Sequence, residues 1–239
     1  NRKGYSCGGS LINNRYILTA AHCLLRTPKS WRLINLRLGE HNIEKSRDCE
    51  SEVPGLEDCS DPPLDVSVEE QIPHELYNPQ DVNQPYDIAL LRLSREVPFT
   101  NFIKPICLPL AEDLRSKNYI GQKLTVAGWG RTENRSQSTV KLKVDVPVMS
   151  NSDCAPTYKR NGVTLVSSQI CAGGEQAKDS CTGDSGGPLM VVDRIVKEEN
   201  YIIHGVVSFG PTPCGVENFP GIYTRVADYV DWIRDHLKP

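Results

Sequence analysis

The stretch Gly183-Asp184-Ser185-Gly186-Gly187-Pro188 places one serine between glycines and beside an acidic residue. Glycine adopts backbone conformations that are closed to other residues, so such a run can form a tight turn whose backbone N–H groups point at one spot. A spot of this kind can stabilise an oxyanion, the largest single contribution to many acyl-transfer reactions. On its own the run is also compatible with an ordinary loop, so its meaning depends on the rest of the chain.

The size and charge of the chain exclude several classes of protein. Its 239 residues suffice for one large domain or two closely packed halves. No run of about 18 apolar residues occurs, so no segment is predicted to span a membrane. Residues 40–70 hold eleven acidic and two basic residues, a net charge of −9, which leaves +6 for the rest of a chain whose total is −3. One acidic loop therefore carries the imbalance, and the chain is not a generally basic nucleic-acid binder.

The cysteines indicate the compartment. The chain has nine of them and no close C-x-x-C pair, which favours disulfides in an oxidising environment over a zinc site. We therefore expect a secreted, extracellular protein, with one cysteine left without a partner. No signal peptide is visible, and because the chain opens mid-pattern we expect that its N-terminus has been removed.

Short apolar runs separated by Gly, Pro and Asn predict many strands and little helix. Between Val140 and Val148, apolar residues alternate with Lys141, Lys143 and Asp145, the pattern of a half-buried strand. The C-terminus alone looks helical, because apolar residues recur there at spacings of four, three and four. The sequence therefore predicts an all-β barrel or sandwich with strands near residues 9–12, 16–19, 33–38, 88–93, 124–127, 201–208 and 221–226, and a helix carrying Val226, Val230, Ile233 and Leu237.

Two further motifs precede the serine turn. The run Thr19-Ala20-Ala21-His22-Cys23 ends an apolar strand with a histidine, and Asp87-Ile88-Ala89-Leu90-Leu91 begins a buried strand with a carboxylate. A lone histidine is more often structural, and a lone aspartate at a strand start is usually a cap or turn residue. The inference therefore rests on the three motifs occurring together, in the order His, Asp, Ser.

These three segments resemble those of the chymotrypsin-type (trypsin-like) serine endopeptidases. The resemblance also takes in Cys7-Gly8-Gly9-Ser10-Leu11 and Val126-Ala127-Gly128-Trp129-Gly130, and it covers essentially the whole chain. It implies an all-β fold of two antiparallel six-stranded β-barrels with a C-terminal helix. One protease domain, lacking its N-terminal activation strand, would occupy residues 1–239, and its two halves would meet near residues 110–122.

The resemblance also implies a role for each residue of the motifs. Ser185 would be the nucleophile, and His22 would act as general base and then as general acid to the leaving amine. Asp87 would fix the tautomer of His22 and stabilise its imidazolium form. The backbone N–H groups of Gly183 and Ser185 would form the oxyanion hole. The other histidines are expected to be structural or exposed: His41, His74, His204 and His236.

Substrate selection is expected to depend on Asp179, six residues before Ser185. In the family this position lies at the base of the primary specificity pocket, where a carboxylate selects a substrate Arg or Lys because an unpaired buried anion is costly. Gly210 and Gly221 match the walls of an open pocket. The alternative is a solvated loop acid. The sequence leaves the preference between Arg and Lys open.

Disulfide pairing is likewise implied by the resemblance. Three pairs follow the family pattern, a fourth is expected to form locally around the acidic insertion, and Cys107 is left over. The expected pairs are Cys7–Cys23, Cys154–Cys171, Cys181–Cys214 and Cys49–Cys59.

The spare Cys107 matches family members that stay covalently tied to an N-terminal regulatory region after activation. Together with the Cys49–Cys59 insertion, it points to arthropod clip-domain proteases such as prophenoloxidase-activating factors. A secreted enzyme of a proteolytic cascade in a haemolymph-like fluid would have three partners: a protein substrate cleaved after Arg or Lys, a clip-type region linked through Cys107, and an upstream activating protease. Neither nucleic acid nor membrane is expected as a partner. Three alternatives are a free buried thiol at Cys107, a non-catalytic homologue acting as a cofactor or binding module, and a broad digestive trypsin.

Two peripheral sites are also predicted. The run Leu38-Gly39-Glu40-His41-Asn42-Ile43-Glu44 resembles the start of the family's calcium loop, and a hard cation takes several oxygen ligands. A structural Ca²⁺ would use Glu40, the Asn42 carbonyl and Asp61, with Asp48 in reserve; the alternative is a solvated acidic face. Asn134-Arg135-Ser136 is a sequon for N-glycosylation.

The family's activation motif, a new N-terminus that begins with a branched apolar residue, is expected about one strand before Asn1 and is absent from the sequence. In active relatives the liberated α-ammonium pairs with the residue that Asp184 matches. Without that partner we expect Asp184 to turn elsewhere and the oxyanion loop to relax, because an unpaired buried carboxylate is costly. The prediction is a zymogen, or a chain whose N-terminal segment is disordered.

Overall fold

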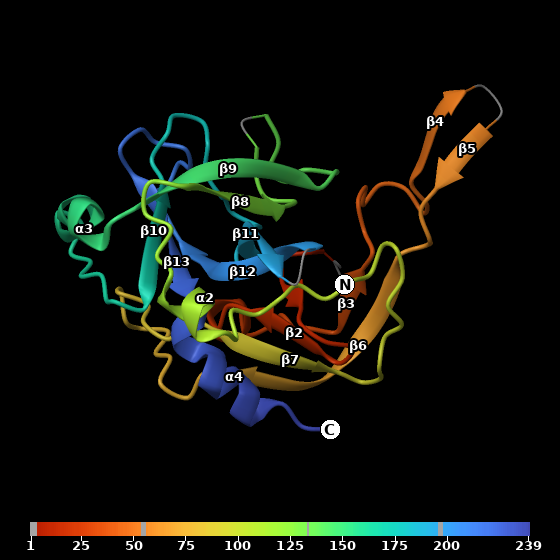
Figure 1. Cartoon of the computed structure of the whole chain (residues 1–239), viewed down its shortest axis with the longest axis horizontal. Coiled ribbons are helices and arrows are strands. Elements are labelled where there is room, and N and C mark those ends of the chain that lie inside the picture. Colours follow the sequence, from red (N-terminus) through yellow and green to blue (C-terminus); the bar gives the residue numbers. More distant parts are fainter. Residues whose placement is uncertain (1–3, 54–55, 133, 196–197) are drawn as a thin grey trace.

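The structure is a computed structural model that describes residues 4–53, 56–132, 134–195 and 198–239, without the side chains of residues 52, 53, 194, 195, 198 and 199. Strands dominate it, and the helices are short (Figure 1). The predicted fold class, an all-β chymotrypsin-like fold with a C-terminal helix, is confirmed.

The N-terminal half is an antiparallel sheet in the order β1-β2-β7-β6-β3. It packs on a core of its own that includes Ile17, Val66 and Leu91. The sequence predicts six strands in a closed barrel here, whereas the described residues supply five and leave β1 and β3 as unpaired edges. The strands are β1 (Ser10–Leu11), β2 (Tyr16–Thr19), β3 (Asn35–Leu38), β6 (Leu64–Pro73) and β7 (Ala89–Leu93).

The C-terminal half is a closed barrel of six strands in the order β10-β13-β12-β11-β8-β9. The alternation predicted around β9 is present: Val146 and Val148 are buried, whereas Lys143 and Asp145 are exposed. Closure leaves no edge strand to be protected. The strands are β8 (Lys123–Gly128), β9 (Leu142–Met149), β10 (Gln169–Gly173), β11 (Pro188–Ile195), β12 (Glu198–Phe209) and β13 (Pro220–Arg225).

The acidic insertion is a two-stranded hairpin rather than a loop. Strand β4 (Cys49–Val53) pairs with β5 (Leu56–Cys59), and Cys49 and Cys59 face each other in the register. The hairpin projects from the body of the molecule (Figure 1).

The helices are short. They are α1 (His22–Leu25), α2 (Glu112–Ser116), α3 (Asn151–Lys159) and α4 (Val230–His236), and a 3₁₀ turn at Val226–Tyr229 leads into α4. The predicted C-terminal helix is therefore present, with a tighter first turn than the apolar spacing suggested. Sequence reasoning missed α3, because Cys154 and Tyr158 are its only buried residues and Pro156 lies inside it.

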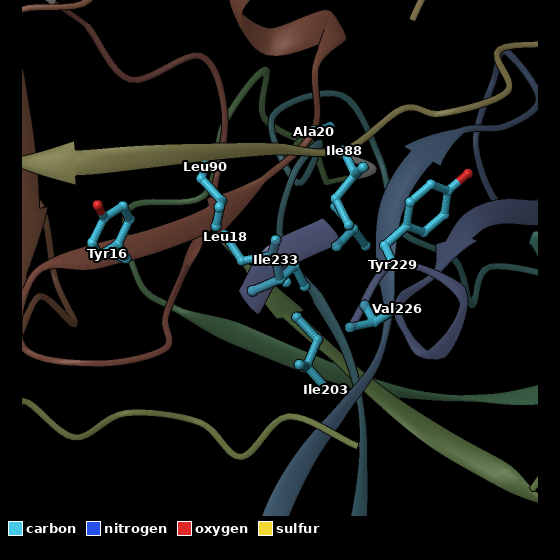
Figure 2. Packing of buried hydrophobic residues seen from close by; sticks show 10 residues of the cluster. Tyr16, Leu18, Ala20, Ile88, Leu90, Ile203, Val226, Tyr229 and Ile233 are labelled. Carbon is cyan, nitrogen blue, oxygen red and sulfur yellow. The ribbon is translucent and has the colours of Figure 1, made fainter. Parts of the chain in front are cut away.

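A shared core joins the two halves. Tyr16, Leu18, Ile88 and Leu90 come from the N-terminal sheet, Ile203 and Val206 from β12, and Val226, Tyr229 and Ile233 from the C-terminal segment. Figure 2 shows Ile233 in the middle of this cluster, with Leu18, Ile88 and Val226 beside it. Neither half can move far from the other without exposing this apolar surface, so the residues at their junction are held in a fixed relation.

Candidate active site

Asp87 and His22 form a close pair in the N-terminal half. Asp87 is completely buried at the start of the segment that becomes β7, and His22 begins α1. Asp87 Oδ2 lies 2.7 Å from His22 Nδ1, and Asp87 Oδ1 accepts the His22 backbone N–H at 2.9 Å. In a neutral imidazole this geometry favours the tautomer whose Nδ1–H donates to the aspartate, which leaves Nε2 as an acceptor.

The C-terminal half completes the surroundings of Asp87. The Ser208 hydroxyl of β12 donates to Asp87 Oδ2, and the Thr224 hydroxyl of β13 donates to the Asp87 carbonyl oxygen at 2.8 Å. The carboxylate thus accepts two hydrogen bonds besides that of the imidazole ring, from His22 N–H and the Ser208 hydroxyl, and Thr224 fixes the backbone of the same residue. Ser208 and Thr224 carry no sequence signal that assigns them to Asp87, because their strands lie more than a hundred residues away along the chain.

The turn at Ser185 is packed against the strand that leads to His22. The Ser185 carbonyl accepts the Gly8 amide at 2.7 Å, and the Gly186 amide donates to the Val207 carbonyl at 2.9 Å. Gly186 has φ +78°, and a Cβ there would overlap the Thr19 hydroxyl and the Gly8 carbonyl. Glycine is therefore required at this position by both conformation and space.

The Ser185 hydroxyl itself makes no hydrogen bond to His22 within the part of the chain that the structure describes. Hydrogen bonds of this kind often tighten only when substrate binds. Gly183 has φ +102° and packs against the backbone of Gly130. Among the described residues, the amides of Gly183 and Ser185 donate to no protein acceptor. Two N–H groups next to the serine are thus available to a ligand oxygen.

Asp184 turns its carboxylate inward. Its oxygens accept the backbone amides of Gly130 at 2.8 Å and Cys181 at 3.0 Å, and no described cation lies against it. Burial raises the pKa of Asp184, whereas the two amides act in the opposite direction. A Cβ on Gly128 or Gly130 would overlap this carboxylate. Among the described residues the partners of the Asp184 carboxylate are thus backbone amides, and the expected relaxation of the oxyanion loop stays a prediction.

The Asp179 carboxylate is a second polar group that was predicted to take part in the site. Its Oδ2 accepts the Gly215 amide at 3.2 Å, but its Oδ1 is buried and has no hydrogen-bond partner among the described residues. A Cβ on Gly221 would lie 3.0 Å from this oxygen, and one on Gly210 would lie 3.5 Å from Gly221 Cα, so both predicted wall glycines border the same space. Burial raises the pKa of Asp179 to about 6, against the lowering effect of backbone hydrogen bonds.

Ser180 is a polar residue beside Asp179 that sequence reasoning missed. Its hydroxyl lies 3.2 Å from the phenolic oxygen of Tyr223, which is fully buried. Its position directly after Asp179 was the available signal. The arrangement is an unpaired carboxylate oxygen with neutral hydroxyl groups beside it, and such a site is suited to a cationic group.

Four disulfides are present, and they are the three pairs implied by the resemblance and the local pair expected around the acidic insertion. Cys181–Cys214 lies beside Asp179, and Cys7–Cys23 braces the turn that carries His22. Cys107 is half-buried and takes part in no disulfide of the described residues, and its backbone bonds to Tyr201 and Ile203 of β12 at 3.0 Å each. The pairs are Cys7–Cys23, Cys49–Cys59, Cys154–Cys171 and Cys181–Cys214.

Two of the carboxylates named for calcium accept hydrogen bonds from the protein. The Glu40 carboxylate receives the His41 amide and the Arg37 guanidinium, and the Asp48 carboxylate receives the Asn42 amide. Asp61 is exposed beyond the hairpin. In the described residues, potential metal ligands gather in threes only around disulfide sulfurs, which cannot bind a metal as thiolates. The calcium site stays a prediction.

The four other histidines and the sequon asparagine are either exposed or packed against neighbouring side chains. His41 is exposed, and His74 stacks between Tyr86 and Trp232. His204 is buried edge-on to Tyr119, and His236 Nε2 lies 2.9 Å from Glu75. Asn134, the sequon asparagine, is exposed.

The sequence matches a known family: the family model described as Trypsin covers residues 1–233. The chain belongs to the trypsin family. A trypsin-family relative, "Serine protease ea" of Drosophila melanogaster, is 48% identical over 99% of this chain and 61% of that protein. "Phenoloxidase-activating factor 1" of Holotrichia diomphalia is 48% identical over the whole chain and 64% of that protein.

A solved trypsin-family structure agrees with this assignment. The crystal structure of the Drosophila Grass clip serine protease of the Toll pathway superposes with a TM-score of 0.84 at 42% identity, over 96% of this chain and 63% of that one. The chain thus spans about three fifths of the length of the curated relatives it matches. Within the described residues, no helix has the length and apolar character needed to cross a bilayer.

Proposed function

We propose that this chain is the catalytic domain of a serine endopeptidase that uses Ser185, His22 and Asp87. The observation that carries the proposal is the buried Asp87–His22 pair, which Ser208 and Thr224 tie to the half of the molecule that holds the Ser185 turn. All three triad residues are intact, which disfavours a non-catalytic homologue. Of the trypsin-family relatives named above, two are serine proteases by name and one is a phenoloxidase-activating factor, and this supports the same chemistry here.

In this mechanism the Ser185 hydroxyl oxygen attacks the carbonyl carbon of the scissile peptide while its proton passes to His22 Nε2. The oxyanion that forms accepts hydrogen bonds from the Gly183 and Ser185 amides. His22 then donates the proton to the leaving amine, and the peptide bond breaks to give an acyl-enzyme and a free amine. Water, deprotonated by His22, repeats the sequence and releases the acid. Asp87 holds the Nδ1 proton and stabilises the imidazolium throughout.

The proposed specificity is cleavage after Arg or Lys. Asp179 Oδ1 is buried without a partner, and a cationic substrate side chain would restore its pairing. A side chain on Gly221 would lie against this oxygen and one on Gly210 would lie against Gly221, so the two glycines keep side chains out of this space.

We further propose that the enzyme is secreted and works in a proteolytic cascade of the melanisation or Toll type, as the names of several relatives suggest for those proteins. Four formed disulfides support an oxidising compartment. The half-buried Cys107 is the proposed attachment point of an N-terminal clip-type region, and an upstream protease would convert the zymogen. The hairpin and the spare cysteine disfavour a broad digestive role.

The test uses chromogenic peptide amides that end in Arg, Lys or Phe, assayed with the full-length precursor before and after limited proteolysis. We expect activity on Arg and Lys amides only after cleavage, and a loss of about 10⁴-fold or more in kcat for Ser185→Ala, since the nucleophile is removed. Activity before cleavage would refute the zymogen. No activity after cleavage would favour the non-catalytic homologue, and equal cleavage of the Phe amide would refute the role of Asp179.

A further inference from the structure

The loop between β6 and β7 reaches Asp87 through a strained backbone. Among the described residues, five other than glycine have a positive φ, and two of them lie in this loop. Gln84 has φ +52° and Tyr86 has φ +62°; they flank Pro85, and Asp87 follows directly. Such values are rare for bulky side chains, because Cβ then lies too close to a carbonyl oxygen. A backbone of this kind persists only where its surroundings hold it.

Hydrogen bonds hold the first of the two strained residues. Gln84 is buried, its side-chain oxygen accepts the Tyr77 hydroxyl at 2.7 Å, and its Nε2 donates to the Asp81 carbonyl at 3.2 Å. From the C-terminal half, Gln169 Nε2 donates to the Asn83 carbonyl at 2.7 Å. The loop is therefore anchored to both halves of the molecule just before it reaches Tyr86.

A stack of three rings holds the second strained residue. The ring centroid of Tyr86 lies 5.0 Å from that of His74, and the centroid of His74 lies 4.9 Å from that of Trp232 in α4. The planes of each pair are 26° apart, and Tyr229 meets His74 edge-on. Rings in these arrangements attract each other beyond the burial of their surface. The C-terminal segment thus supports the side chain of Tyr86 through His74.

His74 contacts both neighbours of Asp87. Its ring stacks on Tyr86, and its backbone N–H donates to the Ile88 carbonyl at 3.0 Å. The Ile88 amide in turn donates to the Tyr86 carbonyl at 2.8 Å, which makes Asp87 the central residue of a three-residue turn. Since the backbone carries the side chain, the residues on either side of Asp87 determine where its carboxylate can lie.

We propose that Tyr86 and His74 are positioning residues: the left-handed backbone of Tyr86, held by its stack on His74, sets the Asp87 carboxylate against His22. The inference rests on the proposed function. If Tyr86 relaxed to a negative φ, the chain would enter Asp87 from another direction, and the 2.7 Å contact with His22 Nδ1 would lengthen. The acid–base pair would then be misaligned, although neither positioning residue touches the reacting atoms.

The experiment compares two substitutions of Tyr86 in the full-length enzyme after limited proteolysis. Tyr86→Val removes the ring and, being β-branched, disfavours the left-handed backbone, whereas Tyr86→Phe keeps the ring. On a chromogenic Arg amide, kcat should fall about 10- to 100-fold in Tyr86→Val and stay within about twofold of the parent in Tyr86→Phe, since small misplacements are costly. KM and the inhibition constant of benzamidine should hardly change, because Asp179 lies outside this loop.

Tyr119→Val is the matched control, because Tyr119 is also a buried tyrosine with a positive φ, +52°, and lies in the other half of the molecule. It should lower thermal stability and leave the kcat of the folded enzyme unchanged. His74→Ala is a second variant, which removes the middle ring and keeps the backbone bond to Ile88. Its kcat should fall about three- to tenfold, whether or not Tyr86→Val folds.

The outcomes separate this inference from the proposed function. Parent kcat in folded Tyr86→Val or in His74→Ala would overturn the inference alone, and so would an equal fall in Tyr119→Val. Failure of the parent enzyme on the Arg amide would instead refute the proposed function.

Discussion

At the residue scale, Asp179 uses its two carboxylate oxygens differently. Oδ2 is bound by the Gly215 amide, whereas Oδ1 is buried without a partner, and burial raises the pKa of the side chain to about 6. The carboxyl group is therefore neutral below that pH and ionised above it. A cationic ligand should bind only the ionised form.

This predicts a pH-dependent affinity for benzamidine, a small amidinium. As the pH falls through about 6, the inhibition constant should rise by about tenfold per pH unit, because each binding event must first remove one proton from Asp179. The inhibition constant is measured from pH 4.5 to 8 against a chromogenic Arg amide. Asp179→Asn should bind benzamidine weakly at every pH. A constant affinity across this range in the parent enzyme would contradict the assignment of Asp179.

His204 makes a second prediction at this scale, about stability. Burial lowers its pKa from 6.5 to about 4, so between these values the unfolded chain takes up a proton that the folded chain does not. The free energy of unfolding should fall as the pH drops through this window, by up to the order of 3 kcal/mol. Urea unfolding at pH 7 and at pH 4.5 measures the change. His204→Phe should show a smaller loss, and an equal loss would exclude His204 as a cause.

The role of a single residue could be predicted from the sequence where that residue lies in a short motif. His22, Asp87, Ser185 and Asp179 stand in short runs whose composition suits their chemistry, and the structure places His22 against Asp87. Ser208 could not be predicted as a partner of Asp87, because only the fold brings its strand there.

At the element scale, the segment after β8 forms a cradle for Asp184. Gly128 ends β8 and Gly130 follows two residues later, and neither has room for a side chain. Since Asp184 lies between Gly183 and Ser185, its position is coupled to that of the two amides that we propose to bind the oxyanion.

Gly130→Ala should therefore impair catalysis without unfolding the chain. Its Cβ would overlap the Asp184 carboxylate, and the displaced turn would misplace the amides of Gly183 and Ser185. We expect a fall in kcat of about 100-fold, comparable to the loss of one oxyanion donor. Hydrolysis of a chromogenic Arg amide measures the change, and circular dichroism checks the fold. Gly4→Ala, which meets nothing within 4 Å, is the control. Unchanged kcat in Gly130→Ala would show that the turn tolerates a displaced Asp184.

Elements could be predicted where burial alternates cleanly, as in β9. The sequence did not show the β4–β5 hairpin, because its alternation is masked by exposed acidic residues on both faces. The same hairpin separates Asp61 from Glu40 along the chain, and a spacing inherited from shorter relatives therefore does not transfer. Identical melting curves in calcium and in EDTA would eliminate the predicted ion.

At the scale of the whole molecule, the shared core around Ile233 determines whether the halves unfold together. Ile233 is 1% exposed and lies among residues of both halves (Figure 2). Ile233→Ala should lower the free energy of unfolding by about 2–5 kcal/mol, through lost burial and the cavity that remains. Denaturant unfolding should stay a single transition. Asp235→Ala, on the exposed face of α4, should change stability by less than about 0.5 kcal/mol. Two separated transitions in the parent would show that the halves are independent.

The proposed acid–base pair and the proposed selectivity residues come from different halves. His22 and Asp87 belong to the N-terminal half, whereas Asp179 and the Ser185 turn belong to the loops of the C-terminal barrel. Substrate selectivity can then change while the acid–base pair stays the same. Exchanging loops of the barrel would direct the enzyme to new substrate sequences without disturbing proton transfer between His22 and Ser185. For an engineer this makes the barrel loops the natural place for libraries, and for a gene family it offers a route by which duplicated copies acquire distinct targets.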